Sequence, residues 1–386
     1  MKFRYIIIIS SLLSFLFISI LLTNYVANNL NIIAHSYLVE KTKKLFPNSV
    51  KKFVKDNSIN HFFLINSSVK KLKKNLNDKN ILNKKKIILK HFLLNESQIK
   101  FNKEDPKGTK VNYIDNNIEL YSVKFYEVTE FGILKKNKQN NRKLLIYIEG
   151  HRGNPYDSKS FLDLKKQFSK LNYDILSLSM SNLGYNEKGY ITNTLNFPGI
   201  NKKEKRHEIY SEYKDKNNPD KYPLSLMLTG NYYLIKNILK KYNYEKTIAV
   251  GISGGGWYVT ILPVLIENID ISISFSGTRS IPFQYYACCK DFDGRYSKIY
   301  NFLDYEDLYY LATLDFDGHQ NRYHYQIYDF NEGEIFGGKF SESMKKISDK
   351  FNNKFFKVKL KYDGKHDINL KMIHKIINNI KSVKNK

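Results

Sequence analysis

One serine of this sequence stands in a setting typical of a catalytic nucleophile. Ser253 is flanked by Gly251 and Gly255 in a Gly-x-Ser-x-Gly pattern, after the apolar run 247–250 and before a helical stretch. In such a strand–turn–helix unit the turn is so tight that the flanking glycine positions have no room for side chains. The helix N-terminus there favours a developing negative charge. The pattern therefore predicts a nucleophile, with the N–H of Gly254 as one oxyanion donor. The alternative, a phosphate-binding turn, lacks the P-loop signature and an acidic residue spaced for a ribose.

A second oxyanion donor is expected from the loop after an earlier strand. The apolar run 144–148 is followed by Glu-Gly-His-Arg-Gly at 149–153, a variant of a His-Gly loop. The backbone N–H groups of His151 and Arg152 are the candidates, and an ordinary tight turn is the alternative reading.

A base and an acid are expected near the C-terminus, in the order serine, acid, histidine. His366 follows the β-rich run 355–360 in an Asp-Gly-Lys-His segment and is the candidate general base. Two carboxyls follow the run 323–328: Asp329 at its end and Glu332 three residues later. The orienting acid usually lies in the loop, which favours Glu332 narrowly over Asp329.

The elements that must position these residues alternate between short apolar runs and helical segments. This alternation predicts an α/β layer fold with a largely parallel sheet. Strands are expected at 118–126, 144–148, 175–178, 247–251, 271–275, 323–328 and 355–360. Helices are expected at 160–171, 224–242, 256–266, 308–314, 340–351 and 370–380.

These motifs resemble the α/β-hydrolase superfamily, with its esterase and prolyl-oligopeptidase-like branches nearest. The resemblance covers roughly residues 111–384 and is carried by 251–255, 150–153, 328–333 and 363–366. It implies an eight-stranded, mostly parallel sheet, no cofactor and an acyl-enzyme mechanism. The loop at 149–153, Glu-Gly-His-Arg-Gly, departs from a plain His-Gly-Gly-Gly. No propeller domain precedes the motifs, which counts against a true prolyl oligopeptidase.

The sequence divides into three regions on this interpretation. Residues 1–22 form an anchor, 23–110 a basic linker or accessory region, and 111–386 the catalytic domain. The polar stretch 181–223 interrupts the domain and is expected to be a lid-like insertion, with a surface loop as the alternative. The basic clusters at 70–74 and 84–86 suit either anionic lipid headgroups or a solvated helix face.

The N-terminus combines two basic residues with an uncharged apolar run at 5–22. Eighteen residues of helix span about 27 Å, close to the hydrocarbon thickness of a bilayer. The residues that follow are a poor cleavage site, so an uncleaved signal anchor is favoured over a signal peptide. Basic residues before the run place the N-terminus in the cytoplasm and the catalytic domain on the other side.

Charge and cysteine content add little to the functional assignment. The net charge is +26, but Lys, Asn and Ile are abundant throughout the chain and no nucleic-acid-binding signature accompanies the charge. A nucleic-acid partner is therefore not expected. The two cysteines, Cys288 and Cys289, are adjacent, so neither a disulfide framework nor a metal site is expected.

The sequence thus predicts a membrane-anchored serine hydrolase that cleaves a small-molecule ester or a peptide bond without a cofactor. Either a carboxylic ester hydrolase or a serine peptidase fits these residues. A non-catalytic binding protein on a hydrolase scaffold is the main alternative, because a fold alone does not establish activity. A basic protein that binds a membrane surface or nucleic acid is the third possibility.

Overall fold

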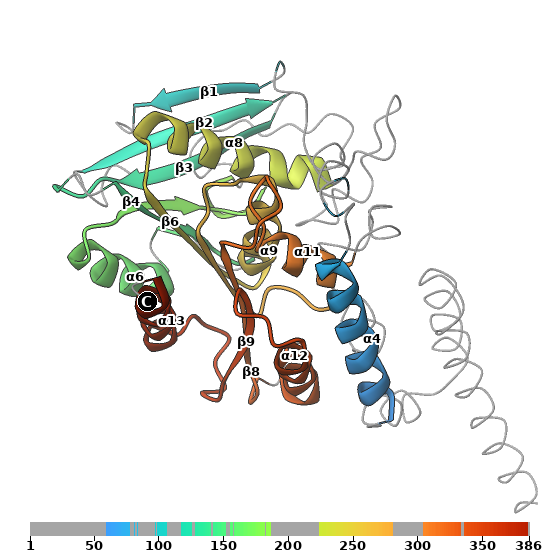
Figure 1. Ribbon diagram of the computed structural model, residues 1–386. Coiled ribbons are helices and arrows are strands. Elements are labelled where there is room, and N and C mark those ends of the chain that lie inside the picture. Colours follow the sequence, from blue (N-terminus) through green and yellow to red (C-terminus); the bar gives the residue numbers. More distant parts are fainter. Residues whose placement is uncertain are drawn as a thin grey trace, which may run out of the picture.

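The sheet at the centre of the molecule has helices on both faces (Figure 1). The computed structural model describes residues 59–77, 99–105, 117–125, 128–139, 142–151, 155, 156, 158–181, 183–186, 224–280, 304–332 and 336–384, with 81, 83 and 97 as single residues. Within these ranges the chain is an α/β protein, as the alternation of runs predicts.

The sheet has nine strands in the order β1-β2-β3-β5-β4-β6-β7-β8-β9. The first three pair antiparallel, β3 pairs antiparallel with β5, and all pairs from β5 to β9 are parallel. Their bounds are β1 Ile99–Glu104, β2 Ile118–Phe125, β3 Val128–Lys135, β4 Lys143–Ile148, β5 Asp174–Leu178, β6 Lys246–Ile252, β7 Ile271–Phe275, β8 Tyr323–Asp329 and β9 Phe356–Lys361.

The expectation of eight strands is wrong by one, and two strands were not predicted from the sequence. β1 pairs with β2 over six residues, so the sheet begins before residue 111, inside the region assigned to a linker. β3 pairs with β2 on one side and β5 on the other. Its buried Glu130 and its Gly132 break the apolar run that marks a covered strand.

Helices cover the two faces unequally and enclose two hydrophobic cores. Alternate residues of β4 enter different cores: Leu144, Ile146 and Ile148 face one, and Leu145 and Tyr147 face the other. The larger core contains residues of α4, α8, α9, α11 and α12, and the smaller contains those of α6 and α13. The helix bounds are α4 Ile59–Leu76, α6 Lys159–Lys170, α8 Leu224–Tyr242, α9 Gly254–Leu265, α11 Tyr305–Leu311, α12 Gly338–Phe351 and α13 Leu370–Lys384.

Helix α6 shows how local sequence sets an element. Ser158 caps its N-terminus by accepting a hydrogen bond from the N–H of Phe161 at 3.2 Å. Phe161, Leu164 and Phe168 recur at helical spacing and are fully buried in the smaller core.

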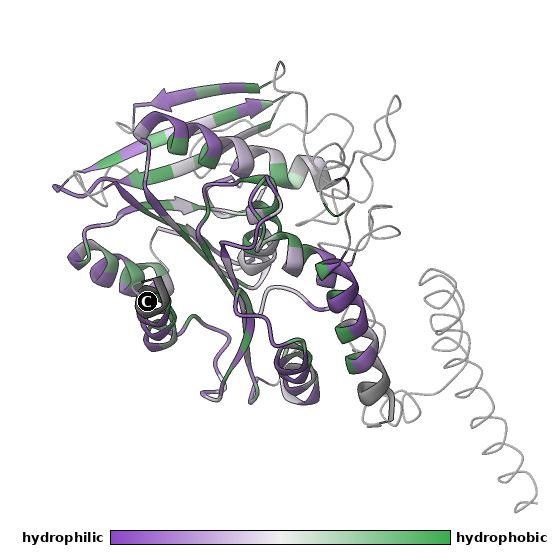
Figure 2. Ribbon diagram, in the orientation of Figure 1, coloured by the Kyte–Doolittle hydropathy of each residue, from purple (hydrophilic) through white to green (hydrophobic). Residues whose placement is uncertain are grey.

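Helix α4 is the first element that the structure describes, and it includes the whole basic cluster 70–74. Figure 2 shows hydrophobic and hydrophilic bands along this helix. Ile65, Val69 and Leu72 are buried against the larger core, and α4 packs on α11 and α12. One face of this basic helix is therefore occupied by protein.

Several expectations fall on residues outside the described ranges. These are the anchor at 1–22, the part of the insertion at 187–223, Arg152, and both cysteines. Of the insertion's first residues, 184–186 form the short 3-10 helix η3, which Asn186 ties to β3 by accepting the N–H of Phe131 at 2.8 Å. None of the described helices combines the length and the apolar character needed to cross a bilayer.

Candidate active site

Ser253 occupies a sharp turn between β6 and α9. Its backbone φ of 55° and ψ of −123° lie in a region that residues other than glycine rarely adopt, and its side chain is half-buried. A β-carbon on Gly251 would lie 2.9 Å from the nitrogen of Gly256, and one on Gly255 would lie 2.6 Å from the carbonyl carbon of Ile148. Backbone occupies the space at both positions, so both must be glycine for this turn to form.

Helix α9 starts directly after this turn, and the N–H groups of a first helical turn have no acceptor within their own helix. Gly254 is the first residue of α9 and is buried. A β-carbon there would lie 2.6 Å from Cε1 of His151, so the loop after β4 lies directly against the turn. Gly150 is equally close, because a β-carbon on it would lie 2.9 Å from Cβ of Ser253. The structure thus brings His151 and Gly254 together beside the serine.

A buried carboxylate fixes the loop that carries His151. Glu149 accepts a hydrogen bond from the hydroxyl of Tyr147 at 2.7 Å and from the N–H of Gly150 at 2.9 Å. Burial, together with the charge of Glu149, holds the pKa of Tyr147 well above its usual value, so the phenol stays a donor.

His366 pairs with Glu332. Nδ1 of His366 lies 2.8 Å from Oε1 of Glu332, and the side chains are 32% and 2% exposed. The second oxygen of Glu332 accepts a hydrogen bond from Ser276 Oγ at 2.9 Å. One carboxylate oxygen therefore faces the imidazole while a hydroxyl holds the other. The hydroxyl of Ser276 was missed in the sequence, where only its place just after a strand hinted at a site.

Asp329 has different partners. Its fully buried carboxylate lies 3.2 Å from Nζ of Lys361 and accepts the N–H groups of Asn331 at 2.9 Å and Lys365 at 2.8 Å. These bonds connect the ends of β8 and β9. Asp329 therefore supports the two loops that carry Glu332 and His366.

The site residues converge because their strands are parallel neighbours. Ser253 follows β6, Ser276 follows β7, Glu332 follows β8 and His366 follows β9. The carboxyl ends of parallel strands share one edge of the sheet, where ligands usually bind. Backbone bonds link these ends: the N–H of Ser253 donates to Phe275 at 2.9 Å, and that of Ser276 donates to Ile327 at 2.8 Å.

A further buried carboxyl lies on β3. Glu130 is fully buried and accepts a bond from Ser181, which follows Met180 next to Gly254. Its Oε2 has no hydrogen-bond partner among the described residues. Burial raises the pKa of Glu130 to about 8, although the bond from Ser181 opposes this.

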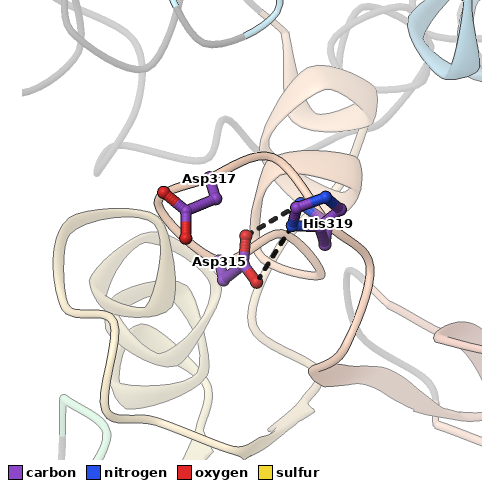
Figure 3. A group of neighbouring side chains, drawn as sticks. All are labelled: Asp315, Asp317 and His319. Carbon is purple, nitrogen blue, oxygen red and sulfur yellow. Dashed lines mark hydrogen bonds and ion pairs between the residues drawn. The ribbon is translucent and has the colours of Figure 1, made fainter.

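One group of possible metal ligands occurs in the described part of the chain, between α11 and β8 (Figure 3). Its members, Asp315, Asp317 and His319, have ligand atoms within 4.8 Å of one another. Asp315 accepts the N–H of His319 at 2.8 Å and the amide of Asn321 at 2.7 Å, so it already shapes this turn. The group precedes β8, so it lies at the amino ends of the parallel strands, whereas Ser253 lies at their carboxyl ends.

Comparisons with known proteins give structural likeness only. No family model and no curated protein matches the sequence. Among solved structures, the chain is similar to an acetyl xylan esterase from Thermoanaerobacterium sp., at 12% identity and a TM-score of 0.47, over 78% of this chain and 92% of the esterase. An acetyl xylan esterase from a Paenibacillus species is 11% identical with a TM-score of 0.47, over 79% of this chain and 95% of the esterase. A glucuronoyl esterase from Caldicellulosiruptor kristjansonii is 12% identical with a TM-score of 0.46, over 76% of this chain and 82% of the esterase.

Proposed function

We propose that the protein is a serine hydrolase that cleaves an ester or amide bond through an acyl-enzyme on Ser253. The observation that carries this proposal is the turn at Ser253, whose positive φ and glycine neighbours expose a hydroxyl at the start of α9. The hydrogen-bonded pair of His366 and Glu332, at the same edge of the sheet, supports it.

The proposed reaction uses four groups of the chain. Oγ of Ser253 attacks the carbonyl carbon of the substrate while His366 removes its proton. The carbonyl oxygen becomes an oxyanion, and the N–H of Gly254 with one from His151 or Arg152 stabilises it. The imidazolium then protonates the leaving alcohol or amine as its bond to the carbonyl breaks. Water, deprotonated by His366, attacks the acyl-enzyme and releases the acid and the free serine.

Glu332 is the orienting acid in this proposal. Its contact with Nδ1 of His366 assigns Nε2 to the serine in this mechanism and stabilises the positive charge that the imidazole gains. The bonds that Asp329 makes with Lys361 and with backbone N–H groups favour a supporting role for that residue.

A fluorophosphonate probe tests the nucleophile. Wild type is expected to be labelled, because the probe phosphonylates an activated serine, and Ser253→Ala is expected to lose the label. Ser67→Ala, which removes an exposed hydroxyl from α4, is the matched control and should label as wild type does. A wild-type protein that folds but takes no label would overturn the proposal.

A substrate panel separates an esterase from a peptidase. p-Nitrophenyl esters of graded acyl length and peptide amides should be compared by kcat/KM on the same preparation. Hydrolysis of either class that disappears in Ser253→Ala assigns the bond type. Activity that survives in that variant would contradict the acyl-enzyme mechanism.

We also propose that residues 1–22 anchor the enzyme as a single span, with the N-terminus cytoplasmic. The uncharged run 5–22 and the preceding Lys2 and Arg4 support this. The native protein is expected to stay with membranes after a carbonate wash, and a chain that lacks residues 1–22 should be released. Release of the full chain would refute the anchor.

A further inference from the structure

The loop that follows β7 is tied to the candidate site at one end. This segment, residues 276–280, is here called the β7 loop, and all its residues are buried. Ser276 donates to Glu332 at 2.9 Å. Gly277 packs against the first turn of α9, since a β-carbon on it would lie 2.5 Å from Cα of Gly256. The β7 loop therefore contacts both the helix that begins at the serine and the carboxylate that faces His366.

The other end of the β7 loop is held by a second buried carboxylate. Ser280 Oγ donates to Oε1 of Glu306 at 2.6 Å, and Glu306 on α11 is 1% exposed. The same oxygen accepts a hydrogen bond from Ser68 Oγ of α4, also at 2.6 Å. Glu306 thus joins the β7 loop to a helix more than 200 residues earlier in the chain.

Helix α4 is itself firmly docked at this point. Lys71 forms ion pairs with Asp304 and with Asp307, the latter at 3.1 Å, and Asn75 donates to Asp307 at 2.8 Å. Burial alone would lower the pKa of Lys71, but the neighbouring carboxylates raise it above its usual value, so the lysine stays charged. α4 therefore presents Ser68 to Glu306 from a fixed position.

We propose that Ser68 and Glu306 are positioning residues for the hydrolysis. Ser68 fixes Glu306, Glu306 fixes the β7 loop at Ser280, and the β7 loop fixes Glu332 through Ser276. A chain of buried hydrogen bonds stiffens the groups it joins, and loss of one donor leaves a buried oxygen unsatisfied, so the others rearrange. The inference rests on the proposed function, because its effect is the alignment of Glu332 with His366.

Hydrolysis of p-nitrophenyl acetate by the full chain tests this coupling. Ser68→Ala is expected to lower kcat between about twofold and thirtyfold, the range for residues coupled at a distance, with little change in KM. The acid limb of the pH profile of kcat/KM should move to lower pH, since a misaligned Glu332 stabilises the imidazolium less. Ser68→Thr keeps the hydroxyl and should restore both, and Ser67→Ala is the control on the same helix.

Two further variants separate coupling from general damage. Ser280→Ala cuts the path from the side of the β7 loop without touching α4, and should reproduce the loss in kcat and the pH shift. Combining Ser68→Ala with Ser276→Ala should give less than the product of the single effects, because both act through Glu332. If Ser68→Ala fails to fold, Ser280→Ala decides the matter.

The outcomes distinguish this inference from the proposed function. A wild type that hydrolyses the ester, with Ser68→Ala and Ser280→Ala matching Ser67→Ala in kcat and pH profile, would overturn the inference alone. Multiplicative effects in the double variant would do the same. A wild type that is neither labelled at Ser253 nor active on any ester or amide would overturn both.

Discussion

Two carboxyls near the end of β8 differ in what binds them. Glu332 faces a half-exposed histidine and a serine hydroxyl, whereas Asp329 is enclosed with Lys361, whose side chain is 3% exposed. An acid that orients a catalytic imidazole is needed for turnover but not for folding. A carboxylate that neutralises a buried lysine is needed for folding. Replacing the carboxylate by an amide should therefore lower turnover at Glu332 and lower stability at Asp329.

We predict that Glu332→Gln lowers kcat by about a hundredfold to ten-thousandfold, because the amide no longer stabilises the imidazolium. Asp329→Asn should instead lower the free energy of unfolding by about 1–3 kcal/mol, since the buried Lys361 then depends on the partly exposed Asp363, at 2.8 Å, for its ion pair. Urea denaturation and steady-state kinetics on both variants check this. Equal losses of kcat at native stability would contradict the assignment.

The buried Glu130 makes a pH-dependent contribution to stability. Its pKa is raised from an ordinary 4.5 to about 8 by burial, so the folded state holds a proton that the unfolded state releases above about pH 4.5. As far as Glu130 is concerned, the free energy of unfolding is therefore highest below pH 4.5 and falls as the pH rises towards 8.

Glu130→Gln should remove this dependence. The variant is expected to match wild type near pH 4 and to exceed it above pH 8, by a difference on the order of a few kcal/mol in the free energy of unfolding. Chemical denaturation across this range is the measurement. Parallel stability curves for the two proteins would show that Glu130 does not titrate in this window.

Most residues of the candidate site could be proposed from the sequence alone, for a reason visible in Ser253 and His366. Ser253 follows a continuous apolar run and His366 follows a run that alternates with lysine, and turn chemistry marks Gly251 and Gly255. The choice between Glu332 and Asp329 depended on where each side chain points, which spacing does not give. Glu306 carried no signal and Ser276 only its place after a strand, because a serine or a glutamate is identified as part of a site by its tertiary partners.

Among the elements, the turn between β6 and α9 is the least tolerant of change. Gly255→Ala would place a carbon 2.7 Å from the carbonyl oxygen of Glu149 and close to Ile148, both backbone. We predict loss of turnover and a lower melting temperature, since strand and helix must separate. Gly364→Ala is a useful control: its φ of +71° costs about 1–2 kcal/mol, but no atom lies within 3.8 Å. A Gly255→Ala variant that is no less stable than Gly364→Ala would refute the close packing.

The elements that were predicted share a strong local signal. The strands β2 and β4 to β9 are apolar runs or alternations, and α8 begins and ends where its periodic pattern predicts. β1 and β3 were not predicted, because the sequence of β1 is polar and the apolar run of β3 is interrupted. Gly132 of β3 sits where a β-carbon would lie 2.9 Å from Leu178, so packing selected a residue that local propensity disfavours in a strand.

At the scale of the whole molecule, α4 is an integral part of the fold. Leu72 is fully buried in the larger core, whereas Leu76 on the same helix is 44% exposed. We predict that Leu72→Ala costs about 2–5 kcal/mol in the free energy of unfolding, from lost burial and the cavity it leaves. Leu76→Ala should change the free energy of unfolding by no more than about 0.5 kcal/mol. Denaturant midpoints measure both, and equal midpoints would mean that α4 is not docked in solution.

The two outermost strands carry a consequence for how the protein behaves when crowded. Within the described part of the chain, β1 and β9 have no strand on their outer sides, and both are rich in lysine. Partial burial, and then the charges of Lys345, Lys357 and Lys375, lower the pKa of Lys359 on β9, so several lysines lie near one another at this strand. If a second copy paired the same strand with β1 or β9, its lysines would lie beside these lysines. The electrostatic repulsion disfavours strand addition and amyloid-like growth at both outer strands.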